Sequence, residues 1–274
     1  MITSVHNELI KQVVALQQRK TRERRKQYVI EGRRFVEEAV LRQASIAKIF
    51  VCPERISNAG GRKLLALLNE RLLSLTEVDE RVMDKLSMTE GPQGVVAVLD
   101  YPPTAWEDFF LDGEPASKNL YSWLIIDGVQ DPGNLGTLLR TALAAGVTRI
   151  LLTRGTVDLY NPKVLRSTMG SLFSLKVLME QEPMNIIRQC AAAGVELIMA
   201  DAGGQSLYKM EDDHCQRPLA LVVGNEGNGP SPLFRQKISH KISIPMQNQV
   251  ESLNVAMAAG IILFEGARRM DKKG

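Results

Sequence analysis

Five polar side chains that could orient or stabilise a reacting oxygen stand shortly after apolar segments that predict β-strands. They are Asn134, Arg140, Glu226, Ser252 and Asn254. Ligands of open α/β sheets bind beyond the carboxyl ends of the strands, so these positions are candidates for one binding site. Each also has a simpler interpretation, because asparagine and serine commonly cap helices and an arginine six residues after Asn134 could lie on a helix surface.

The segment from Gly224 to Gly229 contains three glycines directly after an apolar run. Glycine allows the backbone to approach a ligand closely and to adopt positive φ values. The order G-x-x-G-x-G differs from the dinucleotide-binding G-x-G-x-x-G, and no G-K-[ST] follows as in a phosphate-binding P-loop. Glu226 disfavours a bound phosphate, so we expect a neutral or cationic ligand held by backbone groups. A plain glycine-rich turn is the alternative.

The second half of the chain predicts the elements that would position these residues. Strands are expected at 120–126, 149–153, 195–200, 219–223 and 241–245. Helices are expected at 134–145, 161–169, 183–193, 231–237 and 253–268. The strands are short and apolar on both faces, which is typical of a parallel sheet covered by helices. The fold class is therefore α/β.

The first half predicts a smaller α/β domain. Its expected strands are 28–30, 46–51 and 95–99. Its expected helices are 32–42, 63–69, 78–86 and an opening helix that begins near residue 9 and runs into the basic segment described below. Paired prolines, acidic residues and glycine between 101 and 119 are typical of a linker. The predicted organisation is a domain at 1–100, a linker at 101–119 and a second domain at 120–274.

Positive charge is concentrated in residues 19–34, which hold eight Lys or Arg residues and two acidic ones, whereas the whole chain has a net charge of +3. Such a concentration favours contact with nucleic-acid phosphates, where affinity comes from counterion release. The candidate RNA-binding residues here are Arg22, Arg24, Arg25, Lys26 and Arg33. A solvated helix face is the alternative.

The remaining composition bounds the class of protein. Hydrophobic residues make up 45% and charged residues 24%, which is typical of globular domains and not of disordered chains. No apolar run approaches the roughly 18 residues of a membrane helix. The first residues lack the pattern of a secretory signal, so we expect a cytoplasmic protein. The three cysteines and three histidines are dispersed, so no metal site is expected.

The five polar side chains belong to three loops at expected strand ends, within residues 124–140, 221–230 and 242–256. Together the three loops resemble the SpoU/TrmH family of RNA ribose 2′-O-methyltransferases, within the SPOUT superfamily. The matching motifs are Asn134-x-Gly136-x-x-x-Arg140, Gly224-x-Glu226-Gly227-x-Gly229, and Ile244-Pro245-Met246 with Glu251-Ser252-Leu253-Asn254-Val255. A looser fourth segment contains Asn161, Pro162, Lys163, Arg166, Thr168 and Gly170. The first half resembles the substrate-binding domain of such enzymes, which is similar to a kink-turn-binding ribosomal protein, at Glu31-Gly32, Ile49-Phe50-Val51 and Gly91 to Val98.

This resemblance implies a C-terminal trefoil knot and bound S-adenosylmethionine. The implied cofactor-binding residues are Gly224, Asn225, Gly229, Ile244 and Leu253. It also implies a homodimer in which Asn134 and Arg140 lie near the partner's site, and an RNA contact at Arg166. Asn248 stands where glycine is common in the family, although asparagine also tolerates a left-handed backbone.

The implied reaction is methyl transfer from a sulfonium to a ribose hydroxyl, which requires no metal. We expect Arg140 to stabilise the developing alkoxide, because arginine stays charged in proteins. Ser252 and Asn254 would orient ribose and phosphate, and Glu226 would orient Arg140 or the methyl donor. The N-terminal domain favours ribosomal RNA as substrate. A tRNA methyltransferase and a non-catalytic RNA-binding protein are the alternatives; the presence of all five polar side chains favours the enzyme.

Overall fold

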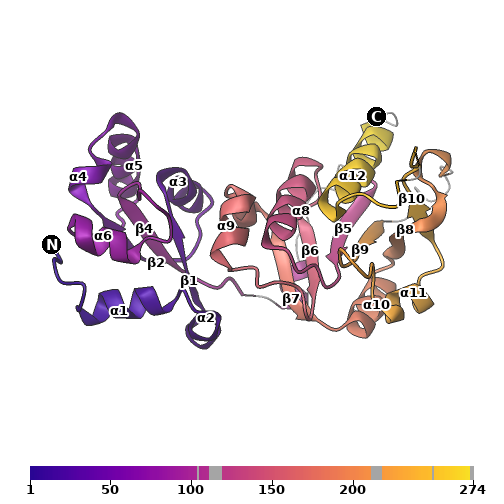
Figure 1. Ribbon diagram of the computed structural model, residues 1–274, viewed down its shortest axis with the longest axis horizontal. Helices are drawn as coiled ribbons and strands as arrows, with labels where there is room; N and C mark the ends of the chain where they lie inside the picture. Colours follow the sequence, from indigo (N-terminus) through magenta and orange to yellow (C-terminus); the bar gives the residue numbers. More distant parts are fainter. Residues whose placement is uncertain (104, 111–118, 211–217, 249, 272–274) are drawn as a thin grey trace. The chain divides into compact units, whose positions relative to one another are not determined.

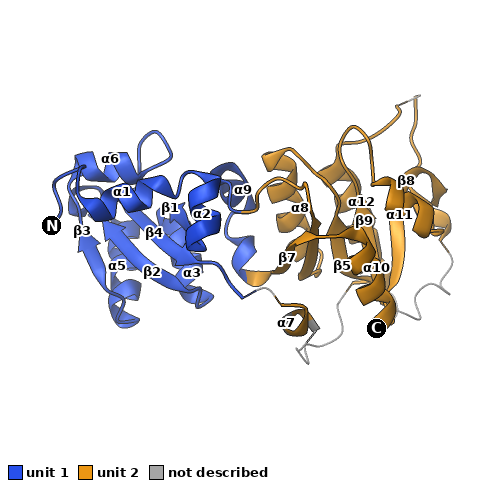
Figure 2. Ribbon diagram, turned by 90° about the horizontal axis from the view of Figure 1, so that it is seen from below, with its two compact units in different colours: residues 1–103, 160–173 blue, residues 104–159, 174–274 orange. Residues whose placement is uncertain are grey.

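The computed structural model describes residues 1–103, 105–110, 119–210, 218–248 and 250–271, and the chain divides into two compact units (Figures 1 and 2). Unit 1 comprises residues 1–103 and 160–173, and unit 2 comprises residues 104–159 and 174–274. Residues 160–173 are thus grouped with unit 1, whereas the sequence-based division assigns them to the C-terminal domain.

Unit 1 contains a four-stranded sheet in the order β1-β4-β2-β3. The strands are β1 (Gln27–Glu31), β2 (Ile46–Val51), β3 (Leu75–Glu77) and β4 (Val95–Asp100). β4 is antiparallel to β1 and β2, and β2 is parallel to β3. Three of these strands are close to their predicted positions. β3 has three residues, none of them buried, so it lacks the apolar run that predicts a strand.

Seven helices of unit 1 are described. They are α1 (Glu8–Ala15), α2 (Arg19–Arg25), α3 (Arg33–Leu41), α4 (Pro53–Ile56), α5 (Ala59–Glu70), α6 (Glu80–Leu86) and α9 (Pro162–Thr168). Asn58 and Asp79 cap α5 and α6, because their side chains accept hydrogen bonds from backbone N–H groups of the first turn. The helix predicted at 63–69 therefore begins four residues earlier, at Ala59.

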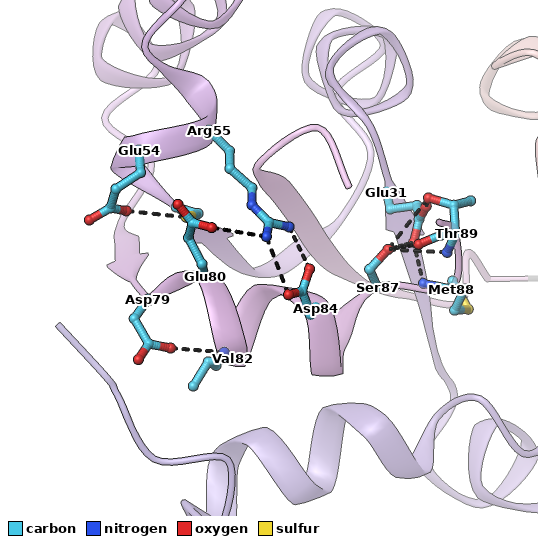
Figure 3. A network of polar contacts seen from close by, with 11 residues as sticks. Glu31, Glu54, Arg55, Asp79, Glu80, Val82, Asp84, Ser87, Met88 and Thr89 are labelled. Carbon is cyan, nitrogen blue, oxygen red and sulfur yellow. Dashed lines mark hydrogen bonds and ion pairs between the residues drawn. The ribbon is translucent and has the colours of Figure 1, made fainter. Parts of the chain in front are cut away.

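A carboxylate ties the loop before β4 to the end of β1 (Figure 3). Glu31 Oε2 accepts hydrogen bonds from the Met88 backbone N at 2.5 Å and from Ser87 Oγ at 3.0 Å, and Glu31 Oε1 accepts one from Thr89 Oγ1. Gly94 closes this loop with φ +81°, and a Cβ there would lie 2.8 Å from Arg55 Cβ. The glycine is required because two turns approach each other closely at this point.

Arg22 lies inside unit 1, which corrects the expectation that it contacts RNA. Arg22 is only 4% exposed, and its Nη1 donates to the backbone oxygens of Leu16 at 2.9 Å and Gln17 at 2.7 Å. These carbonyls follow the last turn of α1, where helices leave acceptors without helical partners. Arg22 therefore caps α1, while the neighbouring Arg24 is exposed.

Unit 2 contains a six-stranded, entirely parallel sheet in the order β10-β8-β9-β5-β6-β7. The strands are β5 (Tyr121–Ile126), β6 (Arg149–Thr153), β7 (Lys176–Gln181), β8 (Glu196–Ser206), β9 (Leu219–Val223) and β10 (Lys241–Ser243). The predicted parallel sheet is confirmed. The predicted strands do not include β7. It is an edge strand in which only Leu178 is buried, and the charged Lys176 and Glu180 leave it only a short apolar run.

Helices cover this sheet. They are α7 (Trp106–Phe110), α8 (Pro132–Ala144), α10 (Pro183–Ala192), α11 (Pro232–Lys237) and α12 (Val255–Asp271), with short 3₁₀ helices at Ser171–Ser174 and Leu207–Lys209. α8 and α12 pack against each other (Figure 1). None of the described helices is both long and apolar enough to cross a membrane. The trefoil knot stays a prediction of the resemblance.

Part of the predicted linker at 101–119 is ordered against unit 2. Phe109 in α7 is buried, with its ring centroid 5.4 Å from that of Trp123 in β5. The indole nitrogen of Trp106 donates to Gln181 Oε1 at 3.0 Å. Residues 104 and 111–118 of the predicted linker lie outside the described residues.

The buried position of Arg22 predicts a selective loss of stability. Arg22→Ala should destabilise unit 1 by about 2–3 kcal/mol, because it removes hydrogen bonds from a buried, charged donor to the carbonyls that follow α1. Arg24→Ala should change stability by less than about 0.5 kcal/mol, as is usual for exposed positions. Both tryptophans, Trp106 and Trp123, belong to unit 2. Urea unfolding should therefore shift in far-ultraviolet circular dichroism and remain unchanged in tryptophan fluorescence; equal stability of the two variants would contradict the cap.

Candidate functional site

The side chain of Asn134, in the first turn of α8, connects the three loops identified in the sequence. Asn134 Nδ2 donates to Glu226 Oε1 at 2.9 Å, and Asn134 Oδ1 accepts from Asn254 Nδ2 at 2.8 Å. Asn254 Oδ1 in turn accepts from the backbone N of Ala256 at 2.9 Å and of Met257 at 3.3 Å, which caps α12. Since a carboxylate only accepts hydrogen bonds, Glu226 fixes the orientation of both amides.

Glu226 is also bound by the backbone of the loop before α8. Its carboxylate accepts from the backbone N of Gln130 at 3.2 Å and of Asp131 at 3.1 Å. Partial burial alone would raise the pKa of Glu226, but the hydrogen bonds from Asn134 and from backbone N–H groups outweigh it and lower the pKa below its ordinary value. Glu226 is therefore a carboxylate at neutral pH, as the network requires.

The glycine loop after β9 closes on itself. Asn225 and Gly229 form an antiparallel bridge, with N···O distances of 3.1 and 2.9 Å. A Cβ at Gly224 would lie 2.0 Å from the backbone N of Pro230, so no larger residue fits, and Gly229 has φ +65°. Gly227 has neither a positive φ nor a close neighbour. Two of the three glycines thus serve the loop's own closure, whereas sequence reasoning assigned them to the approach of a ligand.

A buried aspartate that sequence reasoning did not select connects the ends of two strands to the start of α11. Asp127 follows β5; its Oδ1 accepts from Thr153 Oγ1 at 2.8 Å, and its Oδ2 accepts from the Ser231 backbone N at 2.6 Å. Thr153 Oγ1 also accepts from the Gly128 backbone N at 3.0 Å. The signal was present in the sequence, since an acidic residue directly after a fully apolar strand requires hydrogen-bond donors when buried.

A cavity of about 730 Å³ lies at the carboxyl ends of β9 and β10. All five predicted cofactor-binding residues line it, namely Gly224, Asn225, Gly229, Ile244 and Leu253. Three predicted catalytic residues line it as well, namely Glu226, Ser252 and Asn254. β10 ends at Ser243, two residues earlier than predicted, so Ile244 belongs to the cavity wall instead of the sheet. Asn248 has φ +57°, the left-handed backbone that asparagine tolerates and that explains why glycine is common at this position of the family.

The cavity wall contains more acidic than basic side chains. Asp201, Glu226 and Glu251 line it, together with one arginine, Arg235. Arg235 Nε donates to the Pro230 backbone oxygen at 2.8 Å, and its Nη2 donates to that of Asn228. Arg235 therefore braces the glycine loop, a role that no local motif indicated. The excess of carboxylates suits a ligand that carries positive charge.

Arg140 is not part of this cavity. It is exposed on α8, and no ion pair to it occurs within the described residues. The structure therefore brings together four of the five predicted catalytic residues and leaves Arg140 apart. The six-residue spacing from Asn134 already indicated that the two side chains do not share a helix face.

The predicted RNA-binding residues other than Arg22 all lie at least partly exposed in unit 1. Arg24, Arg25 and Lys26 are exposed at the end of α2, and Arg166 is exposed on α9. Arg33 is half-buried and donates to Asn58 Oδ1 at 2.6 Å. Throughout the part of the chain that the structure describes, no cluster of three His, Cys, Asp or Glu side chains could hold a metal ion.

Comparison with known proteins identifies the family. The model of the SpoU rRNA methylase family matches residues 122–264, and the model of the MRM3-like substrate-binding domain matches residues 7–97. This chain belongs to the SpoU methylase family. The resemblance of the three loops is thereby confirmed, and the pairing of a SpoU methylase domain with a smaller N-terminal domain agrees with the predicted fold.

Several relatives of this SpoU methylase match nearly its whole length. The 23S rRNA (guanosine(2553)-2′-O)-methyltransferase RlmP of Bacillus subtilis is 33% identical, over 96% of this chain and 97% of that protein. The AdoMet-bound rRNA methyltransferase of Sinorhizobium meliloti has 29% identity and a TM-score of 0.82, over 98% of this chain and 97% of that one. AviRb of Streptomyces viridochromogenes, solved with AdoMet, has 26% identity and a TM-score of 0.81, over 98% and 100%.

The lowered pKa of Glu226 predicts a pH-dependent contribution to the stability of this SpoU methylase. A carboxyl whose folded-state pKa is depressed stabilises the fold above its unfolded-state pKa and loses this effect as the pH falls through the folded-state value. Glu226→Gln should therefore lower the free energy of unfolding by about 1 kcal/mol at pH 7, because charged acceptors form the stronger hydrogen bonds and the site is partly solvated. The difference from wild type should shrink once the pH falls below 4.5, the ordinary value.

Tryptophan fluorescence during urea unfolding measures this difference, since both tryptophans lie in unit 2. Glu107→Gln is the matched control, because Glu107 is exposed on α7 of the same unit and no ion pair to it occurs among the described residues. Equal stability of Glu226→Gln and wild type at pH 7 would contradict the proposed role of the carboxylate.

Proposed function

We propose that this protein transfers a methyl group from S-adenosylmethionine to a ribose 2′-hydroxyl of RNA, with ribosomal RNA as substrate. The observation that carries the proposal is the chain of hydrogen bonds from Glu226 through Asn134 to Asn254 at the rim of a ligand-sized cavity. These hydrogen bonds bring polar residues of all three family motifs together in one place. A non-catalytic RNA-binding protein would have no need to retain them.

The cavity suits S-adenosylmethionine in size and in charge. Its volume of about 730 Å³ lies in the usual range of small-molecule sites. S-adenosylmethionine supplies an activated methyl group on a positively charged sulfonium, and the carboxylates of Asp201, Glu226 and Glu251 make the wall acidic. Backbone groups of Gly224, Ile244 and Leu253 would hold the ligand, as the family resemblance implies.

The reaction requires a weakly acidic ribose hydroxyl to be held in line with the methyl group and to lose its proton. Correct placement lowers the barrier because the reacting atoms meet without a further loss of orientational freedom. Asn254 is suited to orient the substrate, since Asn134 fixes its amide from one side and the α12 N-terminus from the other. Ser252 is exposed at the cavity and offers a hydroxyl for the ribose.

Arg140 acts, in this proposal, across a homodimer. α12 exposes large apolar side chains, with Met257 61% and Phe264 52% exposed, and it packs along α8, which carries Arg140. A second copy covering this face would bury the apolar surface and bring Arg140 toward the partner's site. There its guanidinium would stabilise negative charge on the ribose oxygen or the adjacent phosphate. The methyl donor is itself cationic, so the positive charge of Arg140 would not stabilise it.

The substrate assignment rests on unit 1 and on relatives. Exposed cations at the end of α2 are suited to RNA phosphates. The Bacillus subtilis relative is named for a guanosine of 23S rRNA, which favours ribosomal RNA over tRNA. We place the reaction in the cytoplasm, the compartment expected from the sequence.

The closure of the glycine loop predicts that cofactor binding is lost when Gly224 is replaced and kept when Gly227 is replaced. Gly224→Ala should abolish measurable binding of S-adenosylmethionine by calorimetry, because its Cβ would overlap the backbone of Gly229 and Pro230 and displace the loop. Gly227→Ala is the matched control and should keep the affinity, since the nearest atom lies 3.6 Å from its Cβ. Both variants should retain the wild-type circular-dichroism spectrum. Normal binding by folded Gly224→Ala would remove the cofactor site from this loop.

The proposed function predicts methylation of ribosomal RNA from a strain that lacks the gene, seen as an alkali-resistant linkage, and no methylation of RNA from the parent strain. Arg140→Ala should reduce this turnover on the order of 10²–10³-fold, as losses of oxyanion stabilisers do. Arg140→Lys should be nearly as inactive if the planar fork matters, and largely active if charge alone suffices. Affinity for S-adenosylmethionine should stay unchanged. Full turnover by Arg140→Ala would refute its catalytic role.

A mixture of inactive subunits tests whether Arg140 acts on the partner's site. Co-expressed Arg140→Ala and Gly224→Ala chains form heterodimers in which one site combines an intact cofactor loop with an intact partner arginine. Random mixing should then restore roughly a quarter of wild-type activity, since closed dimers pair two equivalent surfaces. Action within one chain would restore none.

A further inference from the structure

The segment from Tyr160 to Phe173 comes from the middle of the methylase sequence but packs into unit 1. Tyr160 is only 2% exposed; its ring stacks on Tyr101 with centroids 4.0 Å apart and lies 4.4 Å from Tyr28. At the other end, Phe173 contacts Phe35 of α3 with centroids 5.4 Å apart. The helix between them, α9, packs on β1, and Figure 2 shows it coloured with unit 1. Aromatic contacts thus hold α9 to the N-terminal fold at both ends.

α9 presents two exposed cations on one face. Lys163 and Arg166 are three residues apart, so their side chains are neighbours on the helix surface, and both are exposed. Val164 and Leu165 are buried beneath them. No described acidic side chain forms an ion pair with Lys163 or Arg166. Their charge is therefore available to a partner.

The end of α2 supplies further exposed cations next to the same aromatic stack. Arg24, Arg25 and Lys26 are exposed, and the described residues contain no ion pair to them. Lys26 Nζ lies 5.8 Å from the ring centroid of Tyr101, the residue that stacks on Tyr160. Two basic segments that are far apart in the sequence are therefore linked through the Tyr101–Tyr160 contact, because Lys26 lies near Tyr101 and Tyr160 stands two residues before α9.

We propose that α9 and the end of α2 form one RNA-binding surface, in which Lys163 and Arg166 bind the phosphate backbone together with Arg24, Arg25 and Lys26. This inference rests on the proposed function for the identity of the partner. It assigns α9 to RNA binding through unit 1, although its sequence belongs to the methylase region. We name the five cations the α2–α9 surface.

The chemistry of the α2–α9 surface favours the phosphate backbone over bases. The rings of Tyr28 and Tyr160 are buried, 3% and 2% exposed, and the half-buried ring of Tyr101 is already stacked on Tyr160, which leaves little aromatic surface for unpaired bases. The exposed groups are long cationic side chains, which bind phosphates with little sequence preference and with strong dependence on salt. The surface should therefore contribute affinity and positioning, while the choice of nucleotide is made elsewhere.

Salt dependence of RNA binding tests the surface with full-length protein and deproteinised 23S rRNA as probe. Two double variants should each weaken the salt dependence: Lys163→Gln with Arg166→Gln, and separately Arg24→Gln with Lys26→Gln. In each, the negative slope of log K against log salt should become shallower by about one to two, close to the charge lost. Arg71→Gln with Lys85→Gln is the matched control, since these exposed cations belong to the end of α5 and to α6, outside the α2–α9 surface. The control should leave the slope unchanged.

Tyr160 distinguishes one composite surface from two separate ones. Tyr160→Ala should lower the slope as much as loss of Lys163 and Arg166, because α9 loses its contact with Tyr101, whereas Tyr160→Phe keeps the stacking ring and should bind normally. Should Tyr160→Ala fail to fold, the exposed charge variants still decide the matter. Affinity for S-adenosylmethionine should be unchanged in every variant.

Two results would overturn the inference: an unchanged salt slope for Lys163→Gln with Arg166→Gln, as an acidic protein partner would give, or a loss of cofactor affinity in that variant. Binding at equilibrium needs no methyl transfer. A wild-type protein that binds the RNA with the expected slopes but does not methylate it would refute the proposed function and leave the surface standing.

Discussion

The hydrogen bonds of the Asn134 side chain are the interaction on which the site depends. One amide donates to Glu226 and accepts from Asn254, so the first turn of α8, the glycine loop and the start of α12 are held in one geometry. The arrangement is directional because Glu226 is ionised at neutral pH and can only accept. The Glu226 carboxylate thus orients the amides of Asn134 and Asn254 in series. Asn254 lines the cavity, and its Oδ1 accepts a hydrogen bond from the first turn of α12.

The parallel sheet of unit 2 makes this network possible. Because all its strands run in one direction, their carboxyl ends lie at one edge, where loops from distant parts of the sequence meet. Asp127 joins the ends of β5 and β6 to the start of α11. The glycine loop is closed by its own backbone and braced by Arg235. The cavity is therefore shaped by hydrogen bonds within the protein, which leaves its backbone preorganised for a ligand.

Unit 1 owes its basic surface to a different kind of contact. The aromatic stack of Tyr28, Tyr101 and Tyr160 brings α9 to β1 and so places Lys163 and Arg166 beside the cations that follow α2. The residues before α9 meanwhile remain bound to unit 2, since the Val157 backbone N donates to Val129 at 2.9 Å. Consecutive residues thus serve the two units in turn, and the change occurs between Leu159 and Tyr160.

Local pattern in the sequence determined five of the six strands of the parallel sheet, the family and the loops that line the cavity, because strand apolarity, glycine spacing and capping residues act over a few positions. Only tertiary structure decided that Arg22 is buried while Arg24 is exposed, since both stand in the same basic run and differ in whether α1 offers carbonyls to them. It also decided that α9 joins unit 1, because the partners of Tyr160 and Phe173 are far away in the chain. Burial depends on such distant neighbours, and no spacing within a segment specifies them.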